Sequence, residues 1–92
     1  MNIQRTPTFD RNIKRLLPNQ KVSLDEAVKA IAANPNIGTA KIGDLQGRYI
    51  YKFKILDQEF LLAYKIVSLD EIKLLMCRTH ENFYRDLKLI KD

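Results

Sequence analysis

Residues 47–84, GRYIYKFKILDQEFLLAYKIVSLDEIKLLMCRTHENFY, decide the fold of this 92-residue chain. Three runs within this stretch, 49–55, 60–66 and 72–76, alternate apolar side chains with others that are often polar. Alternation over adjacent runs joined by short turns is typical of antiparallel strands. The stretch therefore predicts an antiparallel meander with one apolar face and one half-polar face.

The alternation also assigns side chains to the two faces. Pairing Ile55 with Phe60 and Ile66 with Ile72 predicts that Lys65 lies opposite Lys73. The expected second face carries Lys52, Lys54, Lys65 and Lys73 around Leu61, Ala63, Leu75 and Cys77. Lysines on exposed strands can protect a sheet edge from aggregation, and they can equally bind an anionic partner. For Lys65 and Lys73 both interpretations stay open, whereas the pair Lys52 and Lys54 favours a phosphate site.

Two helices are expected before this sheet. Residues 2–6 alternate like a short first strand that ends at Pro7, and Thr8 is the expected N-cap of a helix that stops at Pro18. Ser23 and Glu26 have the spacing of a capping box, which places the start of a second helix there. Its apolar stripe is Leu24, Ala27, Val28 and Ile31, and Asn34-Pro35 ends it.

A third helix is expected after Thr79, with Phe83, Leu87 and Ile90 as its buried stripe. The connection 36–46, NIGTAKIGDLQ, contains no phosphate-binding glycine motif, although its Lys41 is a candidate for a basic rim. The predicted fold is a single α+β domain over residues 1–92. An N-terminal helical hairpin packs on a small antiparallel sheet of three to four strands, and a C-terminal helix follows.

Composition limits the function classes. The chain has 16 Lys and Arg against 11 Asp and Glu, which gives a net charge of +5 and favours a nucleic acid or an acidic protein as partner. One cysteine and one histidine are too few for a disulfide or a metal cluster, so we expect neither metal nor cofactor. No apolar run has the length of a membrane span, and no secretory signal is evident, so we expect a cytoplasmic protein.

Arg78, His80 and Tyr84 are expected to converge where a strand end meets a helix start. RNA cleavage by its own 2′-OH needs a base, an acid and cations that stabilise the phosphorane. A histidine can exchange protons near neutral pH, and Arg78, Lys52 and Lys54 are candidate cations. Two of these residues have alternative roles: His80 as a helix cap and Tyr84 as a half-buried core residue. A separate alternative for the whole protein is a simple basic nucleic-acid-binding module. Cys77 is expected to pack rather than react.

The order of the elements and several segments resemble the RelE/ParE superfamily of bacterial type II toxins. These segments are YKFK (51–54), EFLLAYKI (59–66), CRTHENFYRDLK (77–88) and the longer NPNIGTAKIGDLQGRYIYKFK (34–54). The resemblance covers nearly the whole chain. It implies a toxin that is neutralised by an antitoxin protein and that either cuts mRNA in the ribosomal A site, as RelE does, or poisons DNA gyrase, as ParE does.

The resemblance also implies roles for particular residues. Lys52 and Lys54 match lysines that contact and activate RNA, and Arg78, His80 and Tyr84 match an arginine, an acid or base and an aromatic residue of the cleavage site. Leu61 stands where RelE has an arginine, a cation that Lys65 could replace. We further assign Arg48, Lys65 and Lys73 to RNA binding. The leading hypothesis is a ribosome-dependent mRNA endonuclease that needs no metal; the alternative is a gyrase inhibitor.

Overall fold

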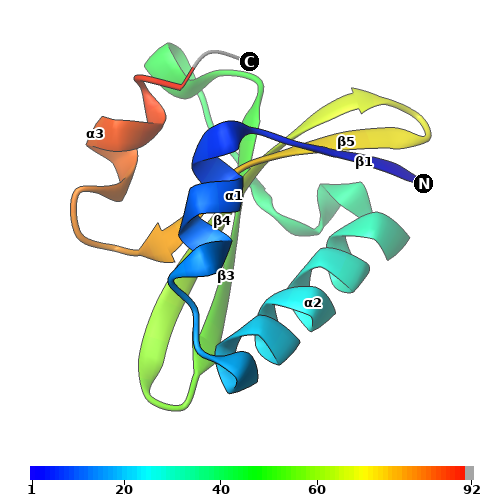
Figure 1. Cartoon of the computed structure of the whole chain (residues 1–92). Helices are drawn as coiled ribbons and strands as arrows, with labels where there is room; N and C mark the ends of the chain where they lie inside the picture. The colour runs from blue at the N-terminus through cyan, green and yellow to red at the C-terminus, as the bar shows by residue number, and fades with distance from the viewer. Residues whose placement is uncertain (91–92) are drawn as a thin grey trace.

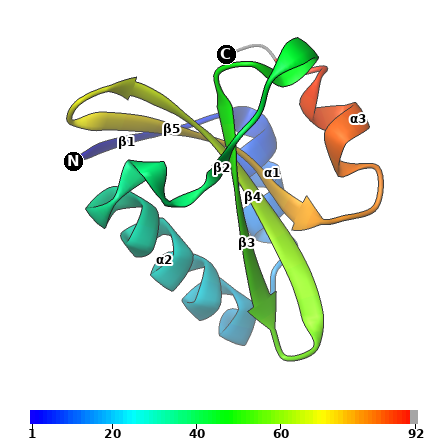
Figure 2. The ribbon, with the colours of Figure 1, turned by 180° about the vertical axis from the view of Figure 1, so that it is seen from behind.

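A five-stranded sheet runs through the protein, and helices cover both of its faces (Figures 1 and 2). The computed structural model describes residues 1–90. The elements are β1 (Asn2–Arg5), α1 (Pro7–Lys14), α2 (Pro18–Ala33), η1 (Pro35–Ile37), β2 (Thr39–Ala40), η2 (Gly43–Leu45), β3 (Arg48–Ile55), β4 (Gln58–Ser68), β5 (Glu71–Thr79) and α3 (Phe83–Leu87). No helix within the described part of the chain is long and apolar enough to cross a membrane.

The α+β class is confirmed, but the sheet is larger and less regular than expected. Its strand order is β1-β5-β4-β3-β2. The pairings among β2, β3, β4 and β5 are antiparallel, whereas β1 pairs with β5 in parallel. The prediction of three to four strands missed β2, because its two residues, Thr39 and Ala40, are too few to show an alternation.

Both N-terminal helices begin earlier than predicted. Thr6, not Thr8, is the N-cap of α1, and its Oγ1 accepts a hydrogen bond from the Phe9 N–H at 3.0 Å. Pro18 starts α2 rather than ending α1, because proline lacks only an N–H that the first helical turn leaves unpaired anyway. The predicted capping box at Ser23 is therefore wrong, because Ser23 lies inside α2. The predicted end at Asn34-Pro35 is confirmed.

The first face of the sheet packs on α1 and α2. Phe9 of α1 and Leu24, Ala27 and Ile31 of α2 are almost completely buried, which confirms the predicted stripe of α2. They share one apolar cluster with the inward-facing side chains of the sheet, including Phe60, Leu62, Tyr64, Ile72, Leu74 and Cys77. Burial of this apolar surface is the main force that holds the helices on the sheet.

The turn between β3 and β4 is shorter than predicted. Ile55 pairs with Gln58, so the turn consists of Leu56 and Asp57 alone. The register differs from the prediction by two residues, which leaves every side chain on its predicted face. Leu56 has a φ of 57°, a left-handed conformation that a leucine seldom adopts.

The β4–β5 pairing begins in the predicted register and then changes. Ile66 pairs with Ile72, and Lys65 with Lys73, as predicted. A bulge after Tyr64 then adds Leu75 to β5, so that Ala63 pairs with Met76. An extra residue inverts the alternation beyond it. Cys77 therefore joins the first face and Met76 the second, the reverse of the prediction.

The second face is not the open, half-polar surface that the sequence led us to expect. Ile50, Leu61, Ala63, Leu75 and Met76 form a second apolar cluster with Leu45 of η2 and with Phe83 and Leu87 of α3. Leu61, Ala63 and Leu75 are fully buried, and so are Phe83 and Leu87. The predicted stripe of the last helix is thus confirmed at these two positions, although Asn82 rather than Thr79 is its N-cap. A short C-terminal helix covers the centre of this face.

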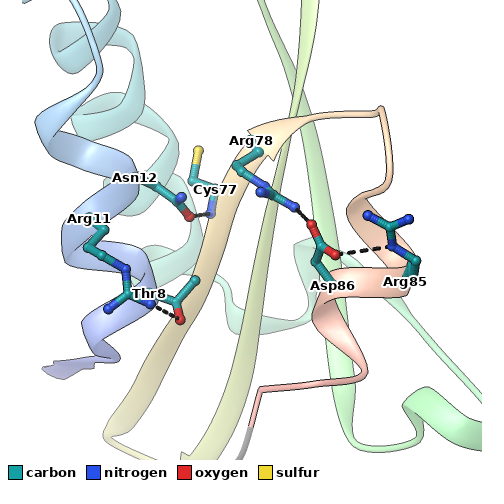
Figure 3. Close-up of polar contacts among 7 residues, drawn as sticks. All are labelled: Thr8, Arg11, Asn12, Cys77, Arg78, Arg85 and Asp86. Carbon is teal, nitrogen blue, oxygen red and sulfur yellow. Dashed lines mark hydrogen bonds and ion pairs between the residues drawn. The ribbon is translucent and has the colours of Figure 1, made fainter.

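The N-terminal helix α1 caps the open edge of β5 beyond its pairing with β1. The Thr6 N–H donates to the Leu74 carbonyl at 3.1 Å, and the Thr6 hydroxyl donates to the Leu75 carbonyl at 2.6 Å. Asn12 Oδ1 accepts from the Cys77 N–H at 3.1 Å (Figure 3). Both side chains are buried, so these bonds satisfy strand groups that would otherwise lack partners. They fix the strand directly before Arg78.

Candidate functional site

A transverse row of side chains brings two of the predicted site residues onto one face. Lys52 of β3 pairs with Leu61 of β4, and Leu61 pairs with Arg78 of β5. Paired residues point to the same face, and two strand spacings amount to about 10 Å. Lys52 and Arg78 therefore lie on either side of Leu61, close enough for one ligand that crosses β4 to contact both. The bulge in β5 is what turns Arg78 to this face.

Lys54 and Lys52 are both exposed on the second face, but their surroundings differ. Lys54 lies opposite Glu59, whose carboxylate belongs to the neighbouring strand. Lys54 also borders a small hollow of about 150 Å³ together with Ser23 and Glu26 of α2. Lys52 lies opposite an apolar residue and is the better placed of the two to act with Arg78.

Arg78 is held by a carboxylate that the sequence did not point to. Its Nη2 forms an ion pair with Oδ2 of Asp86 on α3, and Arg85 Nε lies 3.3 Å from Oδ1 of the same residue (Figure 3). The hydrogen bond from Arg78 is the main cause that lowers the pKa of Asp86, so this carboxylate stays charged at neutral pH. Arg78 therefore reaches any ligand only in competition with Asp86.

Arg78 nevertheless borders three surface hollows, and its side chain remains about 33% exposed. The largest hollow, of about 410 Å³, lies between the start of α1 and the end of α3 and is lined by Thr6, Pro7, Thr8, Met76, Asp86, Leu89 and Ile90. The smallest, of about 170 Å³, includes Arg15, which directly follows α1. A ligand can therefore approach this guanidinium from more than one side.

His80 and Tyr84 contact each other where β5 gives way to α3. Their ring centroids are 5.6 Å apart and the rings are nearly perpendicular, at 76°. This confirms the predicted shared flank, although α3 starts only at Phe83 and the left-handed Asn82 makes the turn. His80 is exposed and Tyr84 partly exposed. Both rings can therefore be reached from the solvent.

The remaining predicted RNA-binding residues form a second cationic row. Arg48 pairs with Lys65, and Lys65 pairs with Lys73, across three neighbouring strands. Arg48 also donates from Nη2 to the carbonyl of Ile90, 3.0 Å away. Four residues along β4 separate Lys65 from Leu61, a span of about 13 Å. The apolar contacts of α3 lie between the two rows, so the expected continuous basic face is divided.

Cys77 is buried, and its burial raises the pKa of the thiol to about 12. The thiol is therefore protonated at neutral pH and is a poor nucleophile. Its position in the first apolar cluster agrees with the packing role inferred from the sequence. Within residues 1–90, no group of three or more His, Cys, Asp or Glu side chains is arranged to hold a metal ion.

Asp86, Asn12, Thr6 and Lys41 shape the site, although the sequence assigned none of them a definite role in it. Asp86 lies eight residues after Arg78. Because a turn separates the strand from the helix, this spacing does not predict that the two side chains meet. Asn12 and Thr6 act through strand groups more than 60 residues away in the chain. Lys41 was noted only as part of a basic rim, yet its Nζ lies 5.1 Å from the centre of the Tyr84 ring.

Comparison with known families decides the class of the protein. Residues 3–88 match the family described as "ParE-like toxin of type II bacterial toxin-antitoxin system". The chain belongs to this family. The match covers nearly the whole toxin and agrees with the resemblance drawn from its strand and C-terminal segments.

Solved structures with the same fold include the isolated RelE toxin of E. coli and the intact E. coli RelBE toxin-antitoxin complex. The chain in the RelBE complex superposes with a TM-score of 0.69 at 14% identity, over 87% of this toxin and 96% of that chain. Isolated RelE superposes with a TM-score of 0.66 at 13% identity, over 96% of both chains. A sequence comparison with curated proteins finds no match. At such low identity the structural likeness establishes the fold alone.

Proposed function

We propose that this toxin is a ribosome-dependent endonuclease that cleaves mRNA through its own 2′-OH, without a metal ion. The observation that carries the proposal is the placement of cations and proton-exchanging groups at one end of the sheet. Lys52 and Arg78 flank Leu61 on one face, and His80 and Tyr84 contact each other just beyond the end of β5. This set supplies the cations and the acid–base group that transesterification of RNA requires.

In the proposed reaction the 2′-oxygen bonds to the adjacent phosphorus and the bond from phosphorus to the 5′-oxygen breaks. The products are a 2′,3′-cyclic phosphate and a free 5′-hydroxyl. His80 either accepts the proton of the 2′-OH or donates a proton to the departing 5′-oxygen, and water exchanges the other proton. Tyr84 stacks on a base or holds the 2′-OH. Lys52, Lys54 and Arg78 stabilise the charge that develops on the phosphorane. Arg48, Lys65 and Lys73 bind the RNA further along the face.

In the proposed site, phosphate binding by Arg78 depends on its ion pair with Asp86. Arg78 can bind a phosphate bidentately only if it gives up part of its contact with Asp86. Because α3 carries Asp86 and also buries Phe83 and Leu87, a shift of this helix would change the availability of Arg78. We infer that RNA binding and the position of α3 are coupled.

The experiment compares purified variants on ribosomes programmed with a defined mRNA, with cleavage mapped by primer extension. His80→Ala should lower the cleavage rate by roughly 10²–10⁴-fold, as expected for the loss of an acid–base group. Arg78→Ala should lower it by roughly 10²–10³-fold through lost charge stabilisation. Arg85→Ala is the matched control, because Arg85 is exposed and contacts the same Asp86; its rate should stay near that of the unmodified toxin. If His80→Ala and Arg78→Ala both fold and stay fully toxic, these site assignments are wrong.

Inhibition of DNA gyrase is the second candidate function. It is favoured by the ParE-like description of the family and by the fully buried Leu61, which leaves no cation at the centre of the row. A supercoiling assay separates the two candidates. A toxin that stalls gyrase and leaves ribosome-bound mRNA intact is a gyrase inhibitor, and the proposed cleavage is then wrong.

We also propose that a cognate antitoxin binds this toxin, as in the structurally similar toxin–antitoxin complex. Ribosomes and gyrase both place the action of the toxin in the cytoplasm. The antitoxin is testable through the adjacent gene, because a short frame encoding a DNA-binding protein should relieve the growth arrest when it is expressed together with the toxin. If expression of the neighbouring frame gives no relief, the antitoxin must be sought elsewhere.

A further inference from the structure

Lys41 contacts the proposed catalytic pair from outside the set of residues assigned to the site. Its Nζ lies 5.1 Å from the centre of the Tyr84 ring, within the range of a cation–π contact. Tyr84 in turn meets the edge of His80 at a centroid distance of 5.6 Å. One lysine from the connection between β2 and β3 thus reaches the aromatic end of the site on α3.

The connection that carries Lys41 is fixed rather than loosely attached. The Lys41 N–H donates to the Arg48 carbonyl at 2.9 Å, which extends the β2–β3 pairing by one residue. Leu45 is buried in the same cluster as Phe83 and Leu87 of α3. Figures 1 and 2 both show this connection beside α3. Lys41 is therefore held in reach of Tyr84 by backbone and core contacts.

Three side chains contact the Tyr84 ring. The Lys41 ammonium lies over one face of the ring, and His80 and Phe83 meet Tyr84 in perpendicular arrangements at 76° and 83°. Tyr84 is only partly buried, so part of its surface stays open to a nucleobase. Stacking on an aromatic ring backed by a cation is a common mode of single-stranded RNA recognition.

Lys41 differs from Arg78 and Lys54 in having no carboxylate partner within the part of the chain that the structure describes. No carboxylate among residues 1–90 forms an ion pair with Lys41, whereas Arg78 pairs with Asp86 and Lys54 lies opposite Glu59. The nearby carboxylate of Asp44 is directed to Lys88 of α3, with an Oδ2–Nζ distance of 3.5 Å. The ammonium of Lys41 is therefore available to an incoming anion.

We propose that Lys41 is a further residue of the RNA site, which binds a phosphate of single-stranded RNA next to the His80–Tyr84 pair and positions the Tyr84 ring. The inference rests on the proposed function, because it places the RNA against His80 and Tyr84. It adds a cation from the β2–β3 connection to a set otherwise drawn from β3, β4, β5, α3 and the turn between β5 and α3. Lys41 acts on the reaction through Tyr84 and is a positioning residue rather than a catalytic one.

The test uses Lys41→Met, which keeps the length of the side chain and removes its charge, and Lys41→Arg, which keeps the charge. Lys29→Met is the matched control, because Lys29 is an exposed lysine of α2 on the other side of the sheet. The probe is a short single-stranded RNA with a 2′-deoxy nucleotide at the cleavage position. Lys41→Met should weaken its binding roughly 3- to 10-fold and lower the salt dependence by about one phosphate contact. Lys41→Arg and Lys29→Met should bind like the unmodified toxin.

The only histidine provides an independent readout of positioning. His80 should give a single set of imidazole signals in a proton NMR spectrum, and ring-current shifts should make these signals sensitive to the orientation of the adjacent Tyr84 ring. Lys41→Met should shift them, whereas Lys41→Arg should restore them and Lys29→Met should leave them in place. Unchanged His80 signals in Lys41→Met would show that Lys41 does not position Tyr84.

The outcomes separate this inference from the proposed function. If the unmodified toxin cleaves mRNA and Lys41→Met binds the RNA probe like Lys29→Met, only the role of Lys41 is refuted. If the unmodified toxin binds the probe through Lys41 but leaves ribosome-bound mRNA intact, the proposed cleavage fails and the RNA contact stands. A toxin that does not bind the probe at all overturns the role of Lys41.

Discussion

Replacing Tyr64 by phenylalanine should destabilise the toxin strongly, because its hydroxyl joins β4 to the segment that follows α2. The hydroxyl donates to the Pro35 carbonyl at 2.5 Å and accepts from the Gly38 N–H at 3.0 Å. Tyr64 is fully buried, and Gly38 permits the contact, since a Cβ there would lie 2.7 Å from the hydroxyl oxygen. Tyr64→Phe removes both hydrogen bonds and leaves the rest of the ring in place.

The magnitude follows from the two lost bonds. Each contributes about 0.5–1.5 kcal/mol net, and the partly buried Gly38 N–H left without a partner adds to the loss, so the free energy of unfolding should fall by about 2–3 kcal/mol. For a domain of this size that corresponds to a drop of roughly 8–24 °C in Tm. Thermal unfolding followed by circular dichroism measures it directly.

Tyr49→Phe is the matched control. The Tyr49 ring stacks on Tyr64 at a centroid distance of 5.4 Å, and its hydroxyl makes no hydrogen bond within residues 1–90. Its Tm should stay within a few degrees of that of the unmodified toxin. If Tyr64→Phe unfolds at the same temperature as Tyr49→Phe, the two bonds do not stabilise the fold and the reasoning is refuted.

Tyr64 should also make the stability of the fold depend on pH in the alkaline range. Burial is the main cause that raises the pKa of Tyr64 above the ordinary value of a tyrosine. The raised pKa stabilises the fold fully below about pH 10, where the unfolded tyrosine begins to ionise, and this stabilisation is lost as the pH rises through the folded pKa. The stability difference between the unmodified toxin and Tyr64→Phe should therefore narrow above pH 10 in urea titrations. A constant difference across that range would contradict the assignment.

Three further experiments test other parts of the structure. Asn12→Ala should lower the free energy of unfolding by about 1–3 kcal/mol in urea titrations, because the buried Cys77 N–H loses its acceptor, while Asn12→Asp keeps an acceptor and should lose less. Leu56→Gly should raise the unfolding free energy by roughly 0.5–1 kcal/mol, because Leu56 is 87% exposed and has a φ of 57°; no gain would show that the turn is unstrained. Cys77 should react with a thiol reagent far more slowly in the native toxin than in urea, because burial raises the pKa of its thiol to about 12; equal rates would contradict its burial.

Local patterns in the sequence were enough to predict much of the fold. The alternation in 49–55 and 60–66 placed Tyr49, Tyr51 and Phe53 on the face that α2 covers, and a turn misjudged by two residues changed nothing. Side chains alternate between the two faces with a period of two, so an error of two residues in the register leaves each side chain on the same face. The stripe of α2 also followed from periodicity. The expected contact between His80 and Tyr84 is present, but His80 lies before α3, so the turn at Asn82 and not helical spacing produces it.

Features that depend on distant contacts escaped the sequence. The bulge at Leu75 is one extra residue in β5, and nothing in the run EIKLLMCRT marks it, yet it turns Arg78 toward Lys52 and Cys77 into the core. The starts of α1 and α2 were misplaced because Thr8 and Ser23 both have acceptable cap chemistry. Tertiary contacts selected Thr6, whose hydroxyl also satisfies the Leu75 carbonyl.

Spacing and charge in the sequence were enough to predict a small basic α+β domain, with lysines on alternate positions of one strand and a histidine four residues before a tyrosine. The toxin class came from the resemblance of whole segments to a known family, and the family match over residues 3–88 agrees with it. The tertiary structure set how the site is assembled. It covered Leu61 with α3, paired Arg78 with Asp86 and brought Lys41 to Tyr84. Each of these contacts joins separate elements, and such contacts arise from packing and bulge geometry, which leave no periodic trace in the chain.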